Sequence, residues 1–197
     1  MDNAHLFELL NAGPGLAPAK LLFAVLLAKW LIVGVPLGLA WAWFRGALSA
    51  CPDLLEVLLS ALPALVVAQL ITWAWPQTRP FAVHLGTQYL EHAPDPGLPS
   101  DHLTVFWSLP VSALFTRRFA PWRFPLLAVG LPVGWSRVYL GVHFPDDILA
   151  ALPVALAGAV AAHGLRHHAA PVFTRLLDYD VRWRSAVGGW LQRFRRS

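Results

Sequence analysis

The sequence has little charge and almost no cysteine. Charged residues make up 13% of its 197 residues, about half the fraction usual in a soluble domain. The single cysteine, Cys51, excludes a disulfide within the chain and any cysteine-based metal cluster, and we expect it to be a small buried residue. The N-terminal residues also lack the basic segment of a cleavable signal peptide, so the first apolar segment is expected to remain in the protein and target it to the membrane.

Apolar residues are abundant instead, at 57% of the chain with a mean hydropathy of +0.54. The pattern predicts an all-α, polytopic membrane bundle with an interfacial helix over 3–15. Most of the predicted spans can cross a core of about 30 Å at about 1.5 Å per residue, and the third is marginal. The five predicted spans are 21–44, 54–75, 102–115, 124–140 and 148–163. Residues 1–165 would form the membrane domain, and 166–197 a basic amphipathic cytoplasmic tail.

The arginines are distributed unevenly between the two sides of such a bundle. One side would carry Arg45, Arg117, Arg118, Arg123, Arg166, Arg175, Arg182, Arg184, Arg193, Arg195 and Arg196. The other side would carry only Arg79 and Arg137, with Lys20 near the first span. By the positive-inside rule the arginine-rich side is cytoplasmic, so loop 76–100 and segment 136–147 face outward. The tail then reads either as a helix on the inner leaflet or as a solvated tail that only sets topology, and nucleic-acid binding is the least favoured reading.

Polar residues gather in these two outward segments. A charge close to the hydrocarbon is expensive, so it indicates a functional site. Segment 136–147 supplies Arg137, His143 and Asp147, and the other loop supplies Arg79, Ser100, Asp101 and His102. Ser100 is a typical helix N-cap, and the backbone N–H groups after it would form an anion site.

Two arginines, a helix N-terminus and two histidines predict a phosphate site. The guanidinium fork matches phosphoryl oxygens, whose negative charge is spread over three positions in the transition state. A metal site is the nearest chemical alternative, because histidine and aspartate are ligands. The arginines make the same site positive, however, which favours an anion over a cation.

The spacing of His143 and Asp147 suits a nucleophile and its orienting carboxylate. They are four residues apart across Pro145, which can open a helix at its first position. Asp147 would then reach one imidazole nitrogen and leave the other free to attack phosphorus. His102 would protonate the leaving oxygen.

Three groups of residues resemble the signature motifs of the type 2 phosphatidic acid phosphatase superfamily. They are Arg79-Pro80, Pro99-Ser100-Asp101-His102 and Ser136-Arg137-x5-His143-x3-Asp147. The Asp form of the second motif, Glu91-His92-Ala93-Pro94-Asp95 and Ala28-Lys29-Trp30-Leu31-Ile32 resemble the bacitracin-resistance type of undecaprenyl-pyrophosphate phosphatase.

The resemblance implies a phosphatase of the bacterial inner membrane with its site facing the periplasm. It implies hydrolysis of an isoprenoid pyrophosphate lipid, undecaprenyl pyrophosphate, without a metal or other cofactor and through a phosphohistidine at His143. His102 would be the general acid and Asp147 the orienter. The implied phosphate ligands are Arg79, Ser100 and Arg137.

One position departs from the superfamily pattern. The lysine usual seven residues before the arginine of the first motif is replaced here by Thr72, which can donate a hydrogen bond but cannot neutralise a phosphate. Lys29, within the first span, could supply the missing charge; alternatively it snorkels to the surface or pairs with an acid such as Glu56. A backbone N–H of Asp101 could also contact phosphate.

Two other functions stay open. The motifs describe a phosphate and not its lipid, so phosphatidylglycerophosphate, phosphatidate or lipid A could be the substrate. A lipid transporter or scramblase would need the anion site but no nucleophile. The remaining histidines are expected to be ordinary polar residues: His5, His84, His163, His167 and His168.

Overall fold

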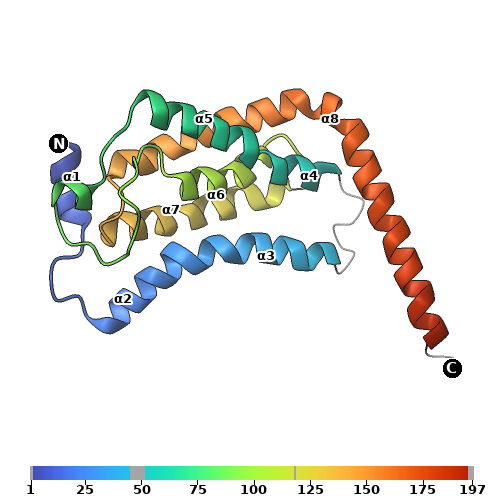
Figure 1. Ribbon diagram of the computed structural model, residues 1–197, viewed down its shortest axis with the longest axis horizontal. Coiled ribbons are helices and arrows are strands. Elements are labelled where there is room, and N and C mark those ends of the chain that lie inside the picture. The colour runs from blue at the N-terminus through green and yellow to red at the C-terminus, as the bar shows by residue number, and fades with distance from the viewer. Residues whose placement is uncertain (1, 45–51, 118, 195–197) are drawn as a thin grey trace.

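The computed structural model describes residues 2–44, 52–117 and 119–194, and every regular element in these ranges is helical (Figure 1). The helices are α1 (Asn3–Leu10), α2 (Pro18–Val25), η1 (Leu26–Trp30), α3 (Leu31–Phe44), α4 (Pro52–Leu59), α5 (Ala61–Ala74), η2 (Pro80–Val83), α6 (Asp101–Ser112), η3 (Ala120–Trp122), α7 (Arg123–Tyr139) and α8 (Pro145–Phe194). Predictions that concern Cys51, Arg45, Arg118, Arg195 and Arg196 lie outside the described residues.

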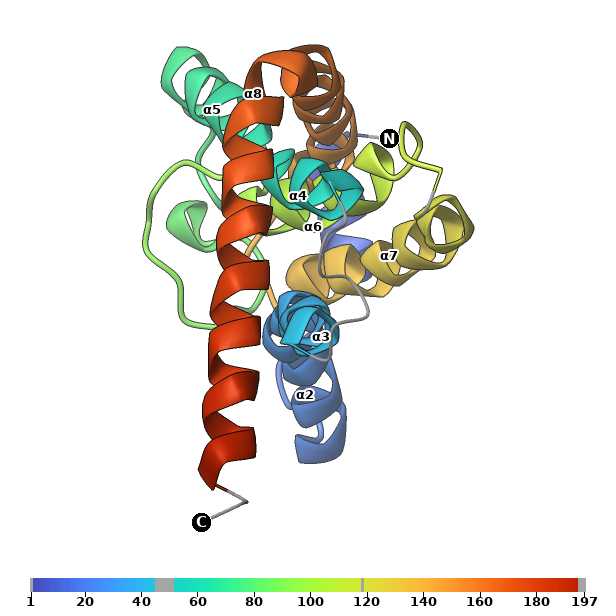
Figure 2. The ribbon, with the colours of Figure 1, turned by 90° about the vertical axis from the view of Figure 1, so that its right-hand side faces the viewer.

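The first apolar segment forms one continuous rod from α2 through η1 to α3, on one side of the bundle (Figures 1 and 2). It begins at Pro18, slightly before the predicted start, because proline fits the first position of a helix. Its middle turn, η1, is a π-helix. Ala24 and Ala28 are fully buried and pack in one cluster with Leu140 and Val142, so the rod meets the segment that follows α7.

The second predicted span is divided into α4 and α5 at Ser60. The hydroxyl of this buried serine lies 2.6 Å from the carbonyl oxygen of Val57 and 3.0 Å from that of Ser108. A serine hydroxyl that bonds to nearby carbonyls competes with regular helix geometry. The break therefore ties this segment to α6.

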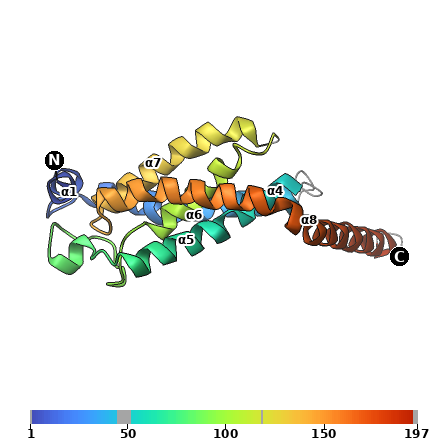
Figure 3. The ribbon, with the colours of Figure 1, turned by 90° about the horizontal axis from the view of Figure 1, so that it is seen from above.

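Helix α6 is the centre of the bundle and lies between α5, α7 and α8 (Figure 3). Its core cluster consists of Leu103, Phe106, Trp107, Val133, Ala151 and Ala155. With 12 residues it reaches only about 18 Å, too short to cross a core of about 30 Å alone. Within the part of the chain that the structure describes, three helices are long and apolar enough to span a membrane: Pro18–Gly38, Glu56–Ala74 and Pro145–His168. The count of five spans therefore stays a prediction.

The fifth predicted span and the tail form one helix, α8, of 50 residues. Its first part packs in the bundle, and its C-terminal part points away from it (Figures 1 and 3). Pro171 lies inside the helix, and a proline there removes one backbone hydrogen bond. The division of the chain at residue 165 stays a prediction.

The N-terminal helix α1 packs against the bundle, and its position at the membrane interface stays a prediction. Phe7 is fully buried, with its ring centroid 5.4 Å from that of Phe144. The Asn11 amide donates to the carbonyl oxygens of Thr87 (3.0 Å) and Tyr139 (3.1 Å). Helix α1 therefore braces the end of α7 and the loop beside it.

A second polar cluster joins α4 and α8. His163 Nδ1 lies 2.8 Å from Glu56 Oε1, and the histidine ring stacks on Phe115. Arg166 contacts the same ring. His163 is therefore an ordinary paired histidine, as predicted. Its partner Glu56 is the acid that was one alternative partner of Lys29. The other four histidines of this group are exposed: His5, His84, His167 and His168.

Candidate active site

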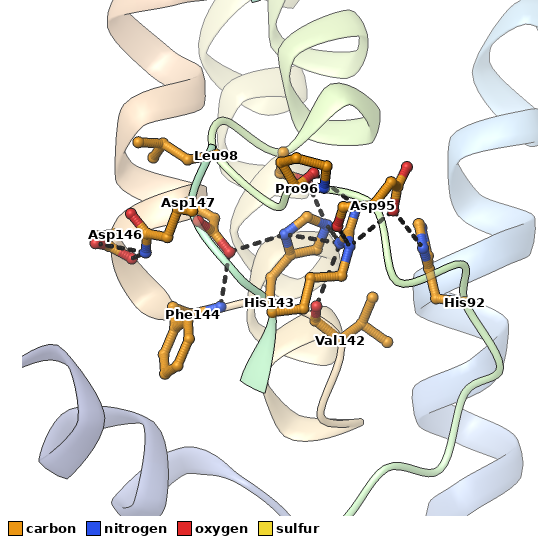
Figure 4. A network of polar contacts seen from close by, with 12 residues as sticks. His92, Asp95, Pro96, Leu98, Val142, His143, Phe144, Asp146 and Asp147 are labelled. Carbon is orange, nitrogen blue, oxygen red and sulfur yellow. Dashed lines mark hydrogen bonds and ion pairs between the residues drawn. The ribbon is translucent and has the colours of Figure 1, made fainter. Parts of the chain in front are cut away.

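The two predicted outward segments meet at one end of the bundle. Backbone hydrogen bonds join them, from the Ser100 N–H to the Asp147 carbonyl (3.0 Å) and from the Tyr89 N–H to the Leu140 carbonyl (2.9 Å). Figure 4 shows the polar network that results, around His143. The predicted convergence of the three motifs is therefore observed.

His143 and Asp147 form the predicted pair. His143 Nδ1 lies 3.0 Å from Asp147 Oδ2, which also accepts from the Phe144 N–H at 2.9 Å. Helix α8 begins at Pro145 and places Asp147 in its first turn. Because the carboxylate accepts from Nδ1–H, the proton lies on Nδ1, and Nε2 is the unprotonated nitrogen that can accept a hydrogen bond. Both side chains are almost completely buried, which fixes the imidazole orientation.

The turn before His143 depends on Gly141. Its φ is +80°, a conformation that favours glycine. A Cβ at this position would collide with the carbonyl oxygen of Thr87 in the neighbouring loop. The turn is closed by hydrogen bonds from the Gly141 N–H to Val138 O and from the Val142 N–H to Arg137 O, both 3.0 Å. This turn ends helix α7 and directs the following chain so that His143 lies in the site.

Arg79 lies beside Nε2, the unprotonated ring nitrogen of His143. Its Nη1 is 3.0 Å from His143 Nε2 and also donates to the Val142 carbonyl at 3.3 Å. Its Nε donates to Asp95, to the carbonyl oxygen at 2.9 Å and to Oδ1 at 3.0 Å. The guanidinium is almost fully buried, so the loop holds it where an electrophile would approach His143.

Arg137 is the second arginine of the site and is only 1% exposed. Among the described residues neither its Nε nor its Nη2 has a hydrogen-bond partner. A buried charged donor without a partner is costly unless it binds an anion. Two adjacent N–H groups of one guanidinium can bind two oxygens of a phosphate at once. The side chain therefore has the donors for an oxyanion.

Ser100 occupies the N-cap position of α6, as predicted, but its hydroxyl makes no capping bond. The Oγ instead lies 3.3 Å from His143 Nε2. The first N–H groups of a helix have no partner within the helix, so those of α6 face the site without a capping side chain. The Asp101 carboxylate accepts from Gln69 (3.3 and 3.4 Å), and His102 follows it on the exposed side.

The surroundings of His143 keep its imidazole neutral. Burial lowers its pKa well below the ordinary value, and the positive charges of Arg137 and Arg79 lower it further. His92 and His102 act in the same direction. A neutral ring whose Nδ1–H is engaged presents an unshared electron pair on Nε2, which is the form that a nucleophile needs.

Two residues of the site carried no predicted role. The His92 ring lies between the catalytic candidates, with its centroid 6.2 Å from that of His143 and 6.3 Å from that of His102. Asp95 forms the ion pair with Arg79. Both belong to the Glu91–Asp95 segment that carried part of the family resemblance, and its position just before Ser100 was the available signal.

The Thr72 side chain donates to the Leu98 carbonyl at 2.9 Å. It therefore ties α5 to the loop before Ser100.

Lys29 is exposed in η1 rather than buried. Among the described residues, no hydrogen bond or ion pair joins it to the site. Val25 and Ile32, one turn away on either side, pack against the core. Lys29 therefore lies on a part of the rod that contacts the bundle, although its own side chain is exposed. Its role as a phosphate ligand stays a prediction.

Within the described ranges, no three His, Cys, Asp or Glu side chains are grouped so that they could hold a metal ion. The groups around His143 are mainly cationic or neutral donors, which suits an anion. Metal independence is a separate prediction about the reaction and stays open to a chelator test.

Comparisons with known proteins agree with this geometry. The PAP2 superfamily matches residues 53–170, a range that contains all three motifs. The chain is 35% identical over 161 residues to "Putative undecaprenyl-diphosphatase YbjG" of Escherichia coli strain K12, covering 81% of this chain and 80% of the relative. It is 33% identical over 132 residues to "Undecaprenyl-diphosphatase BcrC" of Bacillus subtilis strain 168, covering 67% of each.

A solved structure supports the fold. The crystal structure of Aquifex aeolicus LpxE superposes with a TM-score of 0.62 over 80% of this chain and 92% of that chain. The two sequences are 20% identical, so this likeness concerns the arrangement of helices and not the substrate.

Proposed function

Because this chain belongs to the PAP2 superfamily and is a membrane phosphatase, we propose that it hydrolyses undecaprenyl pyrophosphate to undecaprenyl phosphate and inorganic phosphate. The observation that carries the proposal is that the site holds both an oriented, neutral His143 and a buried Arg137 whose Nε and Nη2 have no hydrogen-bond partner among the described residues. The names of two relatives, both undecaprenyl-diphosphatases, support the choice of a lipid diphosphate. The product would return a lipid carrier to cell-wall synthesis, and the activity would confer resistance to bacitracin.

In the first step His143 Nε2 attacks the terminal phosphorus. A nitrogen–phosphorus bond forms while the bond from that phosphorus to the bridging oxygen breaks. Arg137, Arg79 and the N–H groups at the start of α6 stabilise the negative charge on the three equatorial oxygens. Arg79 now donates to Nε2, so it would transfer its hydrogen bond to the phosphoryl group. His102 gives its proton to the bridging oxygen, and the lipid monophosphate leaves.

In the second step a water molecule attacks the phosphorus of phosphohistidine. His102, neutral after the first step, takes a proton from the water. The nitrogen–phosphorus bond breaks, inorganic phosphate forms, and His143 regains its free electron pair. Asp147 keeps the ring in one orientation throughout and stabilises the positive charge that develops on it.

An apolar groove of about 520 Å³ offers a place for part of the isoprenoid chain. Its lining includes Trp107 from α6, Leu127 and Leu131 from α7, and Leu152 and Leu156 from α8. Leu131 precedes Arg137 by six residues, or about 9 Å along the helix. Since α8 is a candidate span, the lipid could enter sideways from the bilayer. We propose that the protein lies in the bacterial inner membrane and that the end of the bundle that carries His143 faces the periplasm.

Phosphate release from a panel of lipids tests the proposed function. The purified protein is given undecaprenyl pyrophosphate, phosphatidylglycerophosphate, phosphatidate and lipid A, with and without excess chelator. We expect turnover of undecaprenyl pyrophosphate that survives the chelator. Turnover of a phospholipid monophosphate with none of the diphosphate would reassign the substrate. Loss of activity with chelator would contradict a metal-independent phosphohistidine route, and lipid transport that survives loss of His143 would indicate a transporter.

Lys29 enters the proposal as an additional phosphate ligand, in place of the lysine absent at Thr72. We expect Lys29→Met to lower turnover of the diphosphate by about 10- to 100-fold with an unchanged melting temperature, since a charged donor to a phosphate is lost. Lys20→Met, an exposed lysine on the same rod, is the matched control. Full activity in Lys29→Met would assign the side chain to snorkelling at the membrane surface.

A further inference from the structure

The histidine that the motifs leave unassigned, His92, lies in the middle of the site. Its ring is edge-on to both His143 and His102, at centroid distances of 6.2 and 6.3 Å. Figure 4 shows it on the loop beside Asp95. Its side chain is 19% exposed, so it is held in the mouth of the site and not in solvent. It makes no contact that the proposed two-step reaction requires.

The contacts of His92 determine which ring nitrogen faces the substrate. Nδ1 lies 3.1 Å from the Ala93 carbonyl oxygen and 3.5 Å from Asp95 Oδ1. Both oxygens accept hydrogen bonds, so Nδ1 carries a proton. The remaining nitrogen, Nε2, makes no hydrogen bond to any other described residue, so it is the atom available to a ligand.

His92 lies at nearly the same distance from the nucleophile His143 and from the proposed acid His102, so the donors already present at each phosphate decide which one it can serve. In the proposed reaction the terminal phosphate would be bound by Arg79, which contacts His143 Nε2, and by Arg137, whose Nε and Nη2 have no partner among the described residues. In the proposed mechanism the leaving oxygen lies beside His102, the general acid that protonates it. An oxygen that accepts a hydrogen bond of about 2.8 Å from each of two imidazoles suits ring centroids roughly 6–8 Å apart. The His92–His102 and His92–His143 distances both fall in this range. Because the arginines already supply donors for the terminal phosphate, His92 is left for the oxygens of the leaving phosphate.

We propose that His92 binds the second phosphate of the substrate, the one that leaves with the lipid, and thereby makes the site selective for diphosphates. This inference rests on the proposed function and deepens it. In a lipid diphosphate the leaving group carries charged oxygens near His102, whereas in a lipid monophosphate it is a single ester oxygen. A cationic His92 would donate from Nε2 to the former and find no acceptor in the latter.

The surroundings of His92 favour its neutral form in the absence of substrate, so the proposal requires that the ring be protonated as the diphosphate binds. Burial lowers its pKa, and Arg79 and Arg137 lower it further, whereas the Ala93 carbonyl and Asp95 act in the opposite direction. A bound diphosphate brings negative charge beside the ring and favours its protonated form. Asp95, which contacts both His92 and Arg79, would link the positions of the two phosphates.

The test compares one isoprenoid chain carrying either two phosphates or one. We expect His92→Ala to lower kcat/KM for the isoprenyl diphosphate by about 10- to 100-fold, as for loss of a hydrogen bond to a charged group. The monophosphate of the same chain length should change by less than about 3-fold. His92→Lys, which restores a cation, should recover part of the preference. His84→Asn is the matched control, an exposed histidine of the same loop in a left-handed conformation that asparagine tolerates.

Inhibition by inorganic pyrophosphate and inorganic phosphate gives a second measurement, independent of any monophosphate turnover. His92→Ala should weaken inhibition by pyrophosphate more than inhibition by phosphate. Equal losses on both substrates and both inhibitors, or no loss at all, would overturn the assignment while leaving the proposed function intact. If the wild type hydrolyses no lipid diphosphate, both the proposed function and the His92 inference fail.

Discussion

His143→Asn is expected to lower the release of phosphate from undecaprenyl pyrophosphate by about 1,000-fold or more. Asparagine is polar and of similar reach, but it has no ring nitrogen that can attack phosphorus. Loss of a nucleophile is among the largest single effects in enzymes, because the remaining groups can only bind and polarise the substrate. The measurement is phosphate release by the purified variant in detergent, with the wild type beside it.

The control for this prediction is His167→Asn, which changes an exposed histidine of α8. It should retain wild-type turnover. Binding of the substrate to His143→Asn should persist, because the two arginines and the start of α6 remain. A His143→Asn variant that keeps a tenth or more of the activity would rule out nucleophilic attack by this residue.

Arg137→Met is expected to lower turnover by roughly 100- to 1,000-fold, the range seen when one preorganised donor to a developing charge is removed. The same variant should be at least as stable as the wild type. Arg137 is buried with two donor atoms that have no partner in the described parts of the chain, and an unpaired buried charge destabilises a fold by about 1–3 kcal/mol. Methionine fills a similar volume without that charge.

Thermal unfolding in detergent measures the second half of this prediction. The melting temperature of Arg137→Met should rise, by roughly 2–4 °C per kcal/mol for a chain of this size. Added phosphate should raise the melting temperature of the wild type but not of the variant, because only a ligand that binds the native state stabilises it. Arg175→Met, an exposed arginine of α8, is the control and should change neither quantity. Lower stability together with lower activity would mean that Arg137 is structural.

The composition and the motif spacing were sufficient to predict the helical class and the place where the motifs meet. Residues such as His143 and Asp147 are separated by one helical turn, so a helix that begins at Pro145 leaves them little freedom. The membrane topology then constrains which loops share a face. This is why the central pair of the site could be predicted without coordinates.

The details that were missed depend on packing between segments that are distant in the sequence. The Ser100 hydroxyl could cap α6 or contact His143, and only the position of the opposite loop determines that it contacts His143. The break at Ser60 likewise depends on a carbonyl of α6. Hydropathy identifies apolar residues in α1 but cannot show that this helix packs against the site. It identifies α6 as apolar as well, but not where the helix ends, so it cannot show that α6 is too short to cross a bilayer alone.

The central claim is that the phosphoryl group passes through His143, and a trapping experiment tests it most directly. Undecaprenyl pyrophosphate labelled in its terminal phosphate is mixed with the purified protein and quenched within one turnover. A phosphohistidine is stable to base and labile to acid, so we predict base-stable label on the peptide that contains His143. No label should remain on His143→Asn. Turnover without any labelled protein, or label on a different residue, would contradict the account.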